Sequence, residues 1–442
     1  MNLNSLQNTS PVLVRLGRKK ICILGLGIEN YALVKFLLKK NAQCDITVCD
    51  ARPSVNKELP LPKKIKRQLG KGYDKNLKQY DIIFRIAGYP LFTKQIIKAM
   101  MAGVEISSPT KLFFDLCPTK NIIGVTGTKG KGTTASLIYH ILKTAGKQVH
   151  LAGNIGVPMF GFMDKIRKND WVVLELSSFQ LEDLPTSPRI AVFTNFFAEH
   201  LAPVDPNNPN YHKSLKTYWD AKENIFAHQS AKDILIANNT LRDKIRLAKP
   251  KGKVIYFTAS KLDTPLLGEH NRKNIAAAVL ATQKAGVKIA DIKKNVKNFR
   301  GLEHRLEFVG EKNKIRYYND SFATAPDATI TALRAFTPKT IVLIAGGADK
   351  GSDFTTLAKE IKKRVRCVIL LPGKGSRRIK QTLLKLKIAK IQNAKNMKQA
   401  VRLGKQNTSS GDVVLLSPAC ASFGIFKNYK ERGNLFKKEI KK

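Results

Sequence analysis

A glycine-rich segment in the first third of the chain has the composition of a phosphate-binding loop. It follows an apolar run that predicts a strand, and a helical pattern follows it. Glycines let backbone N–H groups converge on phosphate oxygens, a helix N-terminus adds positive potential, and a lysine supplies a full charge. The segment therefore predicts a nucleotide site for ATP or GTP, formed by Gly127, Thr128, Lys129, Gly130, Lys131, Gly132, Thr133 and Thr134.

This loop departs from the strict P-loop pattern at two positions. Val125 stands where the first glycine is usual, and Gly132 replaces the Ser or Thr that directly follows the lysine. That hydroxyl normally binds Mg²⁺, so either Thr133 serves instead or the metal depends more on carboxylate and water.

Candidate metal ligands follow two later apolar runs. Glu175 lies near the end of residues 171–176, and His200 comes after residues 191–194, preceded by Asn195 and Glu199. A carboxylate that emerges from a central strand beside bound phosphates suits Mg²⁺, although a helix-capping role is the alternative. A single His is more often structural than a ligand, and only the company of Glu175 favours a metal role for His200.

The elements that position these residues alternate between strand and helix. Residues 21–24 predict a strand, the turn Gly25-Leu26-Gly27 and a helix follow, and a second strand at residues 46–48 ends at Asp50. This arrangement resembles half of a dinucleotide-binding fold, with Asn30 in the place of the third glycine. Asp50 and Arg52 suit ribose and phosphate contacts, and a solvated loop is the alternative.

Further apolar runs at residues 341–344, 367–371 and 413–416 predict a third set of strands, separated by Lys-rich helical stretches. Strands that alternate with helices indicate parallel sheets. We expect an α/β protein of three domains: a Rossmann-like N-terminal domain at 1–109, a central P-loop-type ATPase domain with a parallel sheet at 110–301, and a Rossmann-like C-terminal domain at 302–442. Residues 203–211, rich in Pro and Asn, predict a loop.

The charge of the chain is unusual. The 442 residues include 78 Lys and Arg against 33 Asp and Glu, a formal net charge of +45. One reading is nucleic-acid binding. The basic residues are spread along the whole chain, however, so we interpret them as solvated surface that helps to steer anionic substrates, and we expect no nucleic-acid partner.

The remaining composition indicates a cellular compartment. None of the six Cys residues forms a Cys-x-x-Cys pair, and buried reduced thiols in a cytosolic protein fit best. Residues 1–17 lack the apolar core of a signal peptide, and no run reaches about 18 apolar residues. We expect a cytoplasmic monomer without a membrane span.

Beyond these patterns, the chain resembles the Mur ligases over nearly its whole length. The segments 175–181 (ELSSFQL), 346–354 (GGADKGSDF) and 416–428 (LSPACASFGIFKN) resemble in particular the members that add D-glutamate. The further segments of the resemblance, in the same order along the chain, are 127–134, 153–156 (GNIG), 270–274 (HNRKN), 304–305, 319–321 and the continuation of the last motif to 433.

The resemblance implies an ATP-dependent ligase that joins D-glutamate to UDP-N-acetylmuramoyl-L-alanine through an acyl phosphate, with ATP and Mg²⁺, in peptidoglycan precursor synthesis. It implies that Lys131, Asn154, His200 and Lys222 are catalytic and that Thr133, Glu175, His200 and Lys222 hold the metal. Beside the phosphate loop, the implied ATP contacts are Asn274, Arg305 and Asp320. The implied substrate contacts are Asp50 and Arg52 at the uridine end, Ser177 at the acyl phosphate, and Thr324, Lys350, Ser422 and Tyr429 around D-glutamate.

Lys222 matches the lysine that these enzymes carbamylate, but Lys213 and Lys216 lie in the same region and are its competitors. Several residues depart from the family pattern. Phe322 stands where Lys is usual, Tyr429 replaces Phe, and Glu199 replaces Asp. Ile86-Ala87-Gly88 replaces Ser-Pro-Gly, and the interval from His200 to Lys222 is long. The rival readings are a ligase of the same fold with another amino acid, a nucleic-acid-binding NTPase, and a ligase-like protein without activity.

Overall fold

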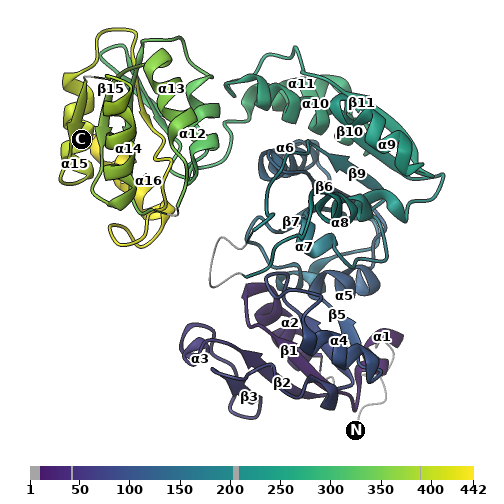
Figure 1. Ribbon diagram of the computed structural model, residues 1–442. Coiled ribbons are helices and arrows are strands. Elements are labelled where there is room, and N and C mark those ends of the chain that lie inside the picture. Colours follow the sequence, from purple (N-terminus) through teal and green to yellow (C-terminus); the bar gives the residue numbers. More distant parts are fainter. Residues whose placement is uncertain (1–9, 41–42, 203–208, 350, 389) are drawn as a thin grey trace. The chain divides into compact units, whose positions relative to one another are not determined.

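The computed structural model describes residues 10–40, 43–202, 209–349, 351–388 and 390–442. Lys350 and most of the predicted loop at 203–211 therefore lie outside the described residues. The chain divides into two compact units, one of Met1–Thr258 with Lys273–Ile292 and one of Ala259–Arg272 with Lys293–Lys442. Figure 1 shows the sheets by colour along the sequence, two in the first unit and one in the second.

The first sheet is parallel and has the strand order of a Rossmann-like domain. Its strands are β1 (Lys20–Leu24), β2 (Asp45–Asp50), β3 (Lys66–Leu69), β4 (Ile82–Arg85) and β5 (Glu105–Ser107). The order β3-β2-β1-β4-β5 is that of the dinucleotide-binding half. The predicted strands at 21–24 and 46–48 are confirmed as β1 and β2. The helical segments are α1 (Pro11–Leu16), α2 (Ile28–Lys39), α3 (Val55–Glu58), η2 (Leu77–Gln79), α4 (Lys94–Met101) and α5 (Pro109–Leu116).

The second sheet is also parallel and carries the phosphate loop. Its strands are β6 (Ile122–Thr126), β7 (Val149–Gly153), β8 (Trp171–Glu175), β9 (Ile190–Phe193), β10 (Ile234–Asn238) and β11 (Lys253–Phe257), in the order β11-β10-β9-β6-β8-β7. β6 is therefore central, with β8 and β9 on its two sides. The helical segments are α6 (Lys131–Thr144), η3 (Met159–Gly161), η4 (Met163–Lys165), α7 (Ser178–Leu181), α8 (Leu215–Ala227), η5 (Asn239–Leu241), α9 (Arg242–Ala248), α10 (Glu269–Lys284) and α11 (Ile289–Asn298).

The third sheet forms the second unit with its helices. Its strands are β12 (Glu307–Lys312), β13 (Ile315–Asn319), β14 (Ile341–Ala345), β15 (Val365–Leu370), β16 (Ile391–Asn393) and β17 (Val413–Leu416), in the order β12-β13-β17-β14-β15-β16. Only the edge pair β12 and β13 is antiparallel among the pairs described. The helices are α12 (Pro326–Leu333), α13 (Thr355–Arg364), α14 (Lys374–Lys385), α15 (Met397–Gln406) and α16 (Tyr429–Lys441).

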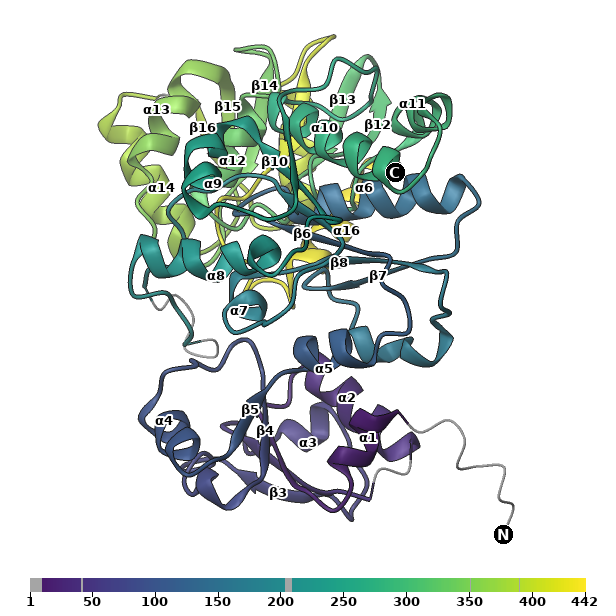
Figure 2. The same cartoon turned by 90° about the vertical axis from the view of Figure 1, so that its right-hand side faces the viewer.

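The α/β class with parallel sheets is thus confirmed, whereas the boundaries at 109 and 301 stay predictions. Figure 2 gives a second view of the alternation of strand and helix. Among the helices of the described residues, none combines the length and the apolar composition that a membrane span requires. All six cysteines are free thiols, and five of them are buried while Cys44 is half-buried, which fits the reduced state expected from their spacing.

The first and second sheets share one hydrophobic core. Residues of α2, α5 and η3 meet there, with the rings of Phe36 and Phe113 at 5.0 and 6.3 Å from that of Phe160. The burial of these apolar side chains, worth about 25 cal/mol per Å² of apolar surface, holds the two domains together.

A buried arginine joins the same two domains on their polar side. Arg85, at the end of β4, is 1 % exposed and lies 3.6 Å from Glu182 and 3.5 Å from Asp183, which follow α7. Its guanidinium also donates to the carbonyls of Tyr89 (2.6 Å) and Phe179 (3.4 Å). Burial raises the pKa of Glu182, and the Arg85 charge opposes that effect. The cation therefore compensates Glu182 and, together with Lys111 at 3.0 Å, Asp183, two carboxylates that would otherwise be costly to bury.

We expect Arg85→Met to destabilise the first unit by about 3 kcal/mol, because it leaves the buried Glu182 without its cation and Asp183 with Lys111 alone. Urea-induced unfolding would measure the loss. The matched control is Arg15→Met, which breaks the exposed pair with Glu105 and should cost at most about 1 kcal/mol. Equal effects of the two substitutions would contradict the role of Arg85, whereas adding Glu182→Gln to Arg85→Met should recover part of the stability.

Candidate functional site

The predicted phosphate loop connects β6 to α6, the position that a nucleotide-binding turn requires. Gly127 has φ +139°, and a Cβ there would lie 2.0 Å from Thr194 Oγ1. Gly130 has φ +84°, and its Cβ would lie 2.2 Å from Asn274 Oδ1. Only glycine fits at both positions, so the backbone runs close to its neighbours, and Asn274 lies beside the loop.

The segment after β9 holds this loop in shape. The N–H groups of Thr128 and Lys129 donate to the backbone and side-chain oxygens of Asn195, at 2.9 and 2.8 Å. Thr194 Oγ1 donates to the Lys129 carbonyl at 2.7 Å, and the Phe197 N–H donates to Thr128 Oγ1 at 3.0 Å. The conformation of the loop therefore depends on residues almost 70 positions further along the chain.

Two lysines donate to the same carbonyl. Lys131 Nζ and Lys222 Nζ lie 3.0 and 2.9 Å from the Gly127 oxygen, and Lys222 also lies over the ring of Tyr218 at 4.8 Å. Lys222 is 1 % exposed. Burial, and then the charge of Lys131, lower the pKa of Lys222 well below its usual range. An amine in this environment is readily deprotonated and is then a nucleophile.

The competing lysines of the same region differ from Lys222. Lys213 is exposed, and the side chain of Lys216 is 83 % exposed and paired with Asp220 on the outer face of α8. Among the three, only Lys222 reaches the phosphate loop in the described structure.

Glu175 lies at the end of β8, directly beside Val125 in the register of β6 and β8. It is 4 % exposed, and its Oε1 accepts the side-chain N–H of Asn154 at 2.9 Å. The other oxygen, Oε2, is buried and has no hydrogen-bond partner among the described residues. A buried carboxylate oxygen in this state, next to a phosphate loop, fits the coordination of a cation.

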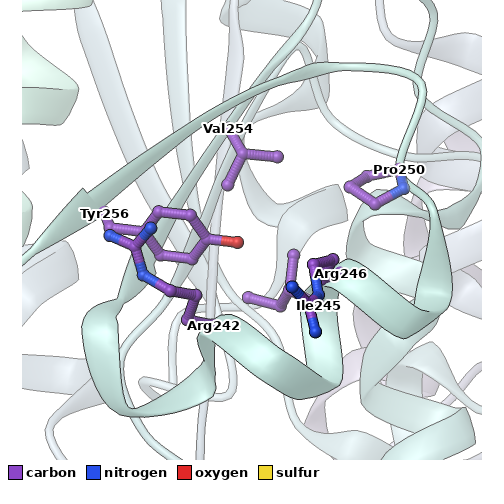
Figure 3. A pocket seen from close by; sticks show the side chains of 6 residues that line it. All are labelled: Arg242, Ile245, Arg246, Pro250, Val254 and Tyr256. Carbon is purple, nitrogen blue, oxygen red and sulfur yellow. The ribbon is translucent and has the colours of Figure 1, made fainter.

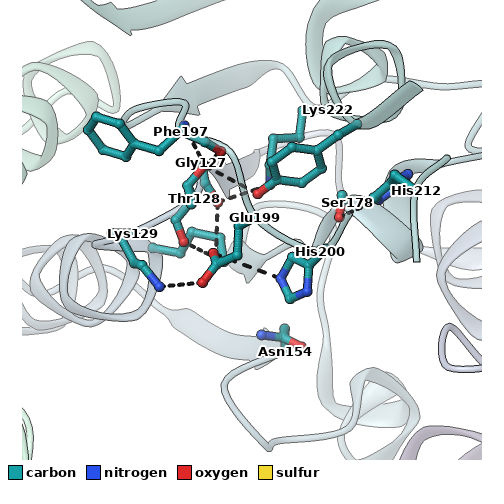
Figure 4. Close-up of polar contacts among 12 residues, drawn as sticks. Gly127, Thr128, Lys129, Asn154, Ser178, Phe197, Glu199, His200, His212 and Lys222 are labelled. Carbon is teal, nitrogen blue, oxygen red and sulfur yellow. Dashed lines mark hydrogen bonds and ion pairs between the residues drawn. The ribbon is translucent and has the colours of Figure 1, made fainter. Parts of the chain in front are cut away.

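Glu199 lies beside Thr128 and Lys129 of the loop, and His200 lies next to Glu199 (Figure 4). Glu199 forms an ion pair with Lys129, and its second oxygen is 3.9 Å from His200 Nε2. Burial lowers the pKa of His200, an effect that Glu199 opposes. Thr133 is half-buried in the first turn of α6. In the described part of the chain, no three His, Cys, Asp or Glu side chains come together as a ready metal cage, so a cation here would also need water and phosphate oxygens.

The sequence did not predict a role for His212, which the structure brings to the same place. Its Nε2 lies 2.9 Å from Ser178 Oγ, and its ring stacks on that of Phe179. Burial, with the charges of His200 and Lys222, lowers the pKa of His212 to about 4, so the ring is neutral near pH 7. The only sequence signal was the rarity of the residue, since the chain has 7 His.

The candidate residues at the first sheet are bonded to each other. Asp50 accepts the Leu26 N–H at 2.6 Å and pairs with Arg52 at 3.0 Å, and Arg52 also donates to the Leu26 carbonyl. Burial opposes ionisation of Asp50, but the hydrogen bonds from Arg52 and Leu26 outweigh it and lower its pKa. Both side chains thus lie at the glycine-rich turn after β1. Ser177, at the second sheet, caps α7 through Gln180.

The second unit holds the remaining candidates in adjacent loops. Asp320 accepts the Leu306 N–H and the Ser417 hydroxyl, at 3.1 and 2.8 Å. The Arg305 guanidinium lies over the ring of Phe322 at 3.8 Å, and Phe322 packs edge-on against Tyr429 at 4.9 Å. The other two candidates lie in these same loops, Thr324 half-buried and Ser422 buried.

Arg432 on α16 joins these loops and was also not predicted. It is fully buried, donates to Ser321 Oγ at 3.0 Å and to the Ser321 carbonyl at 2.8 Å, and donates to the Cys420 carbonyl at 3.1 Å. Burial lowers its pKa to about 10, which leaves the guanidinium charged near pH 7. The segment around Ser321 and the one that leads to Ser422 are therefore held in one arrangement.

A separate surface pocket of about 390 Å³ lies between α9 and β11 (Figure 3). The Arg242 guanidinium lies over the ring of Tyr256 there, at 4.4 Å. The pocket is lined by Arg242, Ile245, Arg246, Pro250, Val254 and Tyr256, none of which is a predicted site residue. The candidate chemistry is thus elsewhere in the unit, at the phosphate loop.

Comparison with known proteins gives matches along most of the chain. Residues 19–108 match the N-terminal domain of the MurD-like Mur ligases, residues 125–263 the Mur ligase middle domain, and residues 304–420 the glutamate ligase domain of Mur ligases. The chain is 37 % identical to the UDP-N-acetylmuramoylalanine–D-glutamate ligase of Acetivibrio thermocellus, over 96 % of this chain and 97 % of that one. It is 36 % identical to the protein of the same name from Clostridium tetani, over 96 % of each.

Solved structures share the fold at low sequence identity. The UDP-N-acetylmuramate–alanine ligase of Thermotoga maritima superimposes with a TM-score of 0.58 at 19 % identity, over 96 % of this chain and 99 % of that one. The MurF ligase of the same organism, solved in complex with ADP, gives a TM-score of 0.59 at 15 % identity over 98 % and 99 %.

We expect Asp320→Asn to change how stability depends on pH. Burial raises the pKa of Asp320 to about 7, against the hydrogen bonds that lower it. The pKa of an unfolded Asp is about 3.9, so between about pH 4 and 7 the folded protein keeps a proton that the unfolded chain has lost. The contribution of Asp320 to the free energy of unfolding therefore falls as the pH rises through that window and is constant above it. The difference in Tm between the variant and the unsubstituted protein should therefore rise from about pH 5 to about pH 8. The rise should correspond to a few kcal/mol in the free energy of unfolding. Thermal unfolding across this range measures the difference, and a constant difference would contradict the assignment.

Proposed function

Because the chain belongs to the Mur ligase family, we propose that it is the member that adds D-glutamate to UDP-N-acetylmuramoyl-L-alanine at the cost of ATP, in peptidoglycan precursor synthesis. The relatives named for this reaction match 96 % of the chain at 36–37 % identity. We also propose that the protein is cytoplasmic.

One observation carries the proposal at the level of chemistry: the register of β6 and β8 places Glu175 beside the phosphate loop with a buried carboxylate oxygen that has no hydrogen-bond partner among the described residues. Lys131, at the first turn of α6, supplies the charge for the ATP phosphates. Asn274 lies at Gly130, where it would approach the nucleotide. Arg305 and Asp320 are the proposed nucleotide contacts of the second unit.

The reaction follows from the weakness of a carboxylate as an electrophile. Transfer of the terminal phosphoryl group of ATP to the carboxylate of the UDP-linked substrate gives an acyl phosphate and ADP. The amine of D-glutamate then attacks the acyl carbon, the C–N bond forms, and phosphate leaves. Catalysis is mainly positioning and charge neutralisation, in which Lys131 binds phosphate oxygens while Asn154 and Ser177 line the acyl phosphate.

The residues present fit Mg²⁺. Glu175 offers a carboxylate oxygen, His200 a ring nitrogen and Thr133 a hydroxyl, and the remaining ligands would be water and phosphate oxygens. When bound, Mg²⁺ would neutralise the charge that develops on the transferred phosphoryl group.

Lys222 is the proposed site of carbamylation. Its amine is buried among the Gly127 carbonyl, the Thr126 hydroxyl and the Tyr218 ring, with no carboxylate within ion-pair distance in the described structure. In its neutral form the nitrogen would attack CO₂, form an N–C bond and release one proton, which leaves a carbamate monoanion. The modification would thus replace an amine at the metal site with an anion.

The two ends of the substrates meet different loops. Asp50 and Arg52 at the turn after β1 are the proposed contacts of the uridine end. Thr324, Ser422 and Tyr429 in the second unit are the proposed contacts of D-glutamate, together with Lys350, whose cation would pair with a carboxylate of the amino acid.

We expect D-glutamate to be the preferred amine. The test is phosphate release with UDP-N-acetylmuramoyl-L-alanine and ATP across a panel of amino acids. Equal activity with L-lysine or diaminopimelate would reject the substrate assignment. The control is Lys131→Ala, which removes the lysine charge proposed to bind the ATP phosphates and should lower turnover by about 100-fold or more, so that a contaminating ATPase is excluded.

We expect Lys222→Ala to be nearly inactive and to recover part of its turnover with acetate or another short-chain acid, which would supply the missing carboxylate. The matched control is Lys216→Ala on the exposed face of the same helix, which should keep full activity. Labelling with ¹³C-bicarbonate provides a direct measurement, because a carbamate carbon signal should be present in the unsubstituted protein and absent in Lys222→Ala. Full activity of Lys222→Ala would rule out the carbamate.

A further inference from the structure

We propose that His212 is a positioning residue for the ligase reaction, which holds Ser178 and the ring of Phe179 and through them fixes the imidazole of His200. The inference rests on the proposed function, since His200 is assigned there to the metal. Nothing in the sequence pattern singled out His212.

The His212 ring forms a hydrogen bond with one residue of α7 and stacks on the next residue. Its edge lies 2.9 Å from Ser178 through Nε2 and Oγ. Its face stacks on the ring of Phe179, with 4.7 Å between centroids and 8° between planes. The side chain is 2 % exposed, so both contacts are shielded from water. A phenyl ring would stack equally well, and the buried nitrogen is satisfied through Ser178.

The same rings surround His200. The His200 ring packs edge-on against Phe179 at 5.4 Å and against Tyr218 at 6.0 Å, and Tyr218 lies 5.1 Å from His212. We call these residues, Phe179, His200, His212 and Tyr218, the four-ring cluster. His212 touches both rings that flank His200, so a change of the His212 ring is transmitted to the imidazole.

The backbone gives a second connection between the two histidines. His200 has φ +59°, a left-handed conformation that is unfavourable for a residue other than glycine. Its carbonyl accepts the N–H of His212 at 2.8 Å. This hydrogen bond joins the backbone at His212 to the backbone at His200 and helps to hold His200 in its conformation.

Ser178 belongs to the segment that carries other residues of the proposed site. It follows Ser177 directly, and Glu175 is three positions earlier at the end of β8. His212 therefore joins two parts of the proposed site, the segment after β8 and the segment after β9. Figure 4 shows His212 beside Ser178, with His200 near Glu199 and Asn154.

The variants separate the two properties of the ring. His212→Phe keeps the stacking and removes the hydrogen bond, whereas His212→Gln keeps a polar group for Ser178 and removes the ring. Ser178→Ala removes the partner. The matched control is His150→Phe, because His150 also stacks on a phenyl ring, that of Phe162 at 5.1 Å and 3°, and also bonds through Nε2, to Asp170 at 2.9 Å. It lies in β7, toward the opposite end of the strand from Asn154.

We expect His212→Phe to lower kcat by roughly 10- to 100-fold while the KM values for ATP and D-glutamate change little, because a misplaced group affects the chemical step more than binding. Ser178→Ala should lower kcat similarly. The double variant with His212→Phe and Ser178→Ala should have a kcat no lower than that of either single variant. His212→Gln should retain more activity than His212→Ala. His150→Phe should keep the original kcat, so that loss from general loosening of the domain is excluded.

A second measurement does not depend on turnover. In ligand-free protein with ¹⁵N-labelled histidine, the His200 ring signals should shift in His212→Phe and stay in place in His150→Phe. The inference is overturned by an original kcat in His212→Phe, by additive losses in the double variant, by an equal loss in His150→Phe, or by unshifted His200 signals. If the unsubstituted protein did not use D-glutamate, the proposed function would fail, whereas the NMR comparison would still decide whether His212 positions His200.

Discussion

The parallel pairing of β6 with β8 on one side and β9 on the other is the constraint on which the candidate site depends. Because the carboxyl ends of parallel strands meet at one edge of a sheet, the residues after these three strands come together. They are the phosphate loop, Glu175 with the segment to Ser178, and the segment from Thr194 to His200. A slip of one residue in β8 would turn Glu175 to the other face of the sheet and separate it from the loop. The helices then add side chains to an arrangement that the strands have already set.

Much of this arrangement was readable in the sequence, because apolar runs predict the strands and polar residues at their ends predict the site. The position of Lys222 was readable in part. Tyr218, Lys222, Ile225 and Phe226 recur at helical spacing on the buried face of α8, so a lysine in that stripe is unusual, whereas Lys216 falls outside it. The four-ring cluster was not readable. Its contacts join side chains from separate segments of the chain, and stacking between rings leaves no periodic signal in the sequence.

The net charge of the chain does not indicate which basic residues have a structural role. Of the 78 Lys and Arg, the side chains of Arg85, Lys222 and Arg432 are buried in the described structure, and each donates to backbone carbonyls at the end of a strand or in a loop. Such carbonyls have left the sheet and need donors, which a long cationic side chain provides without a neighbouring element. These three basic side chains therefore shape the loops that carry candidate residues. The composition alone could not distinguish them from the solvated majority.

Two of the residues that depart from the family pattern contact each other. Phe322 and Tyr429, both unusual at their positions, pack edge to face at 4.9 Å, and the Phe322 ring also carries the Arg305 guanidinium at 3.8 Å. A lysine at position 322 would bring a second cation toward Arg305, whereas the phenyl ring attracts it. The absence of a cation at position 322 is thus accompanied by the Arg305 cation, which lies over the ring from the adjacent loop. Glu199 likewise forms an ion pair with Lys129 of the phosphate loop. Phe322 and Tyr429 contact each other, and Glu199 contacts a residue of the phosphate loop, so these substitutions are not in themselves evidence for a protein that has lost its activity.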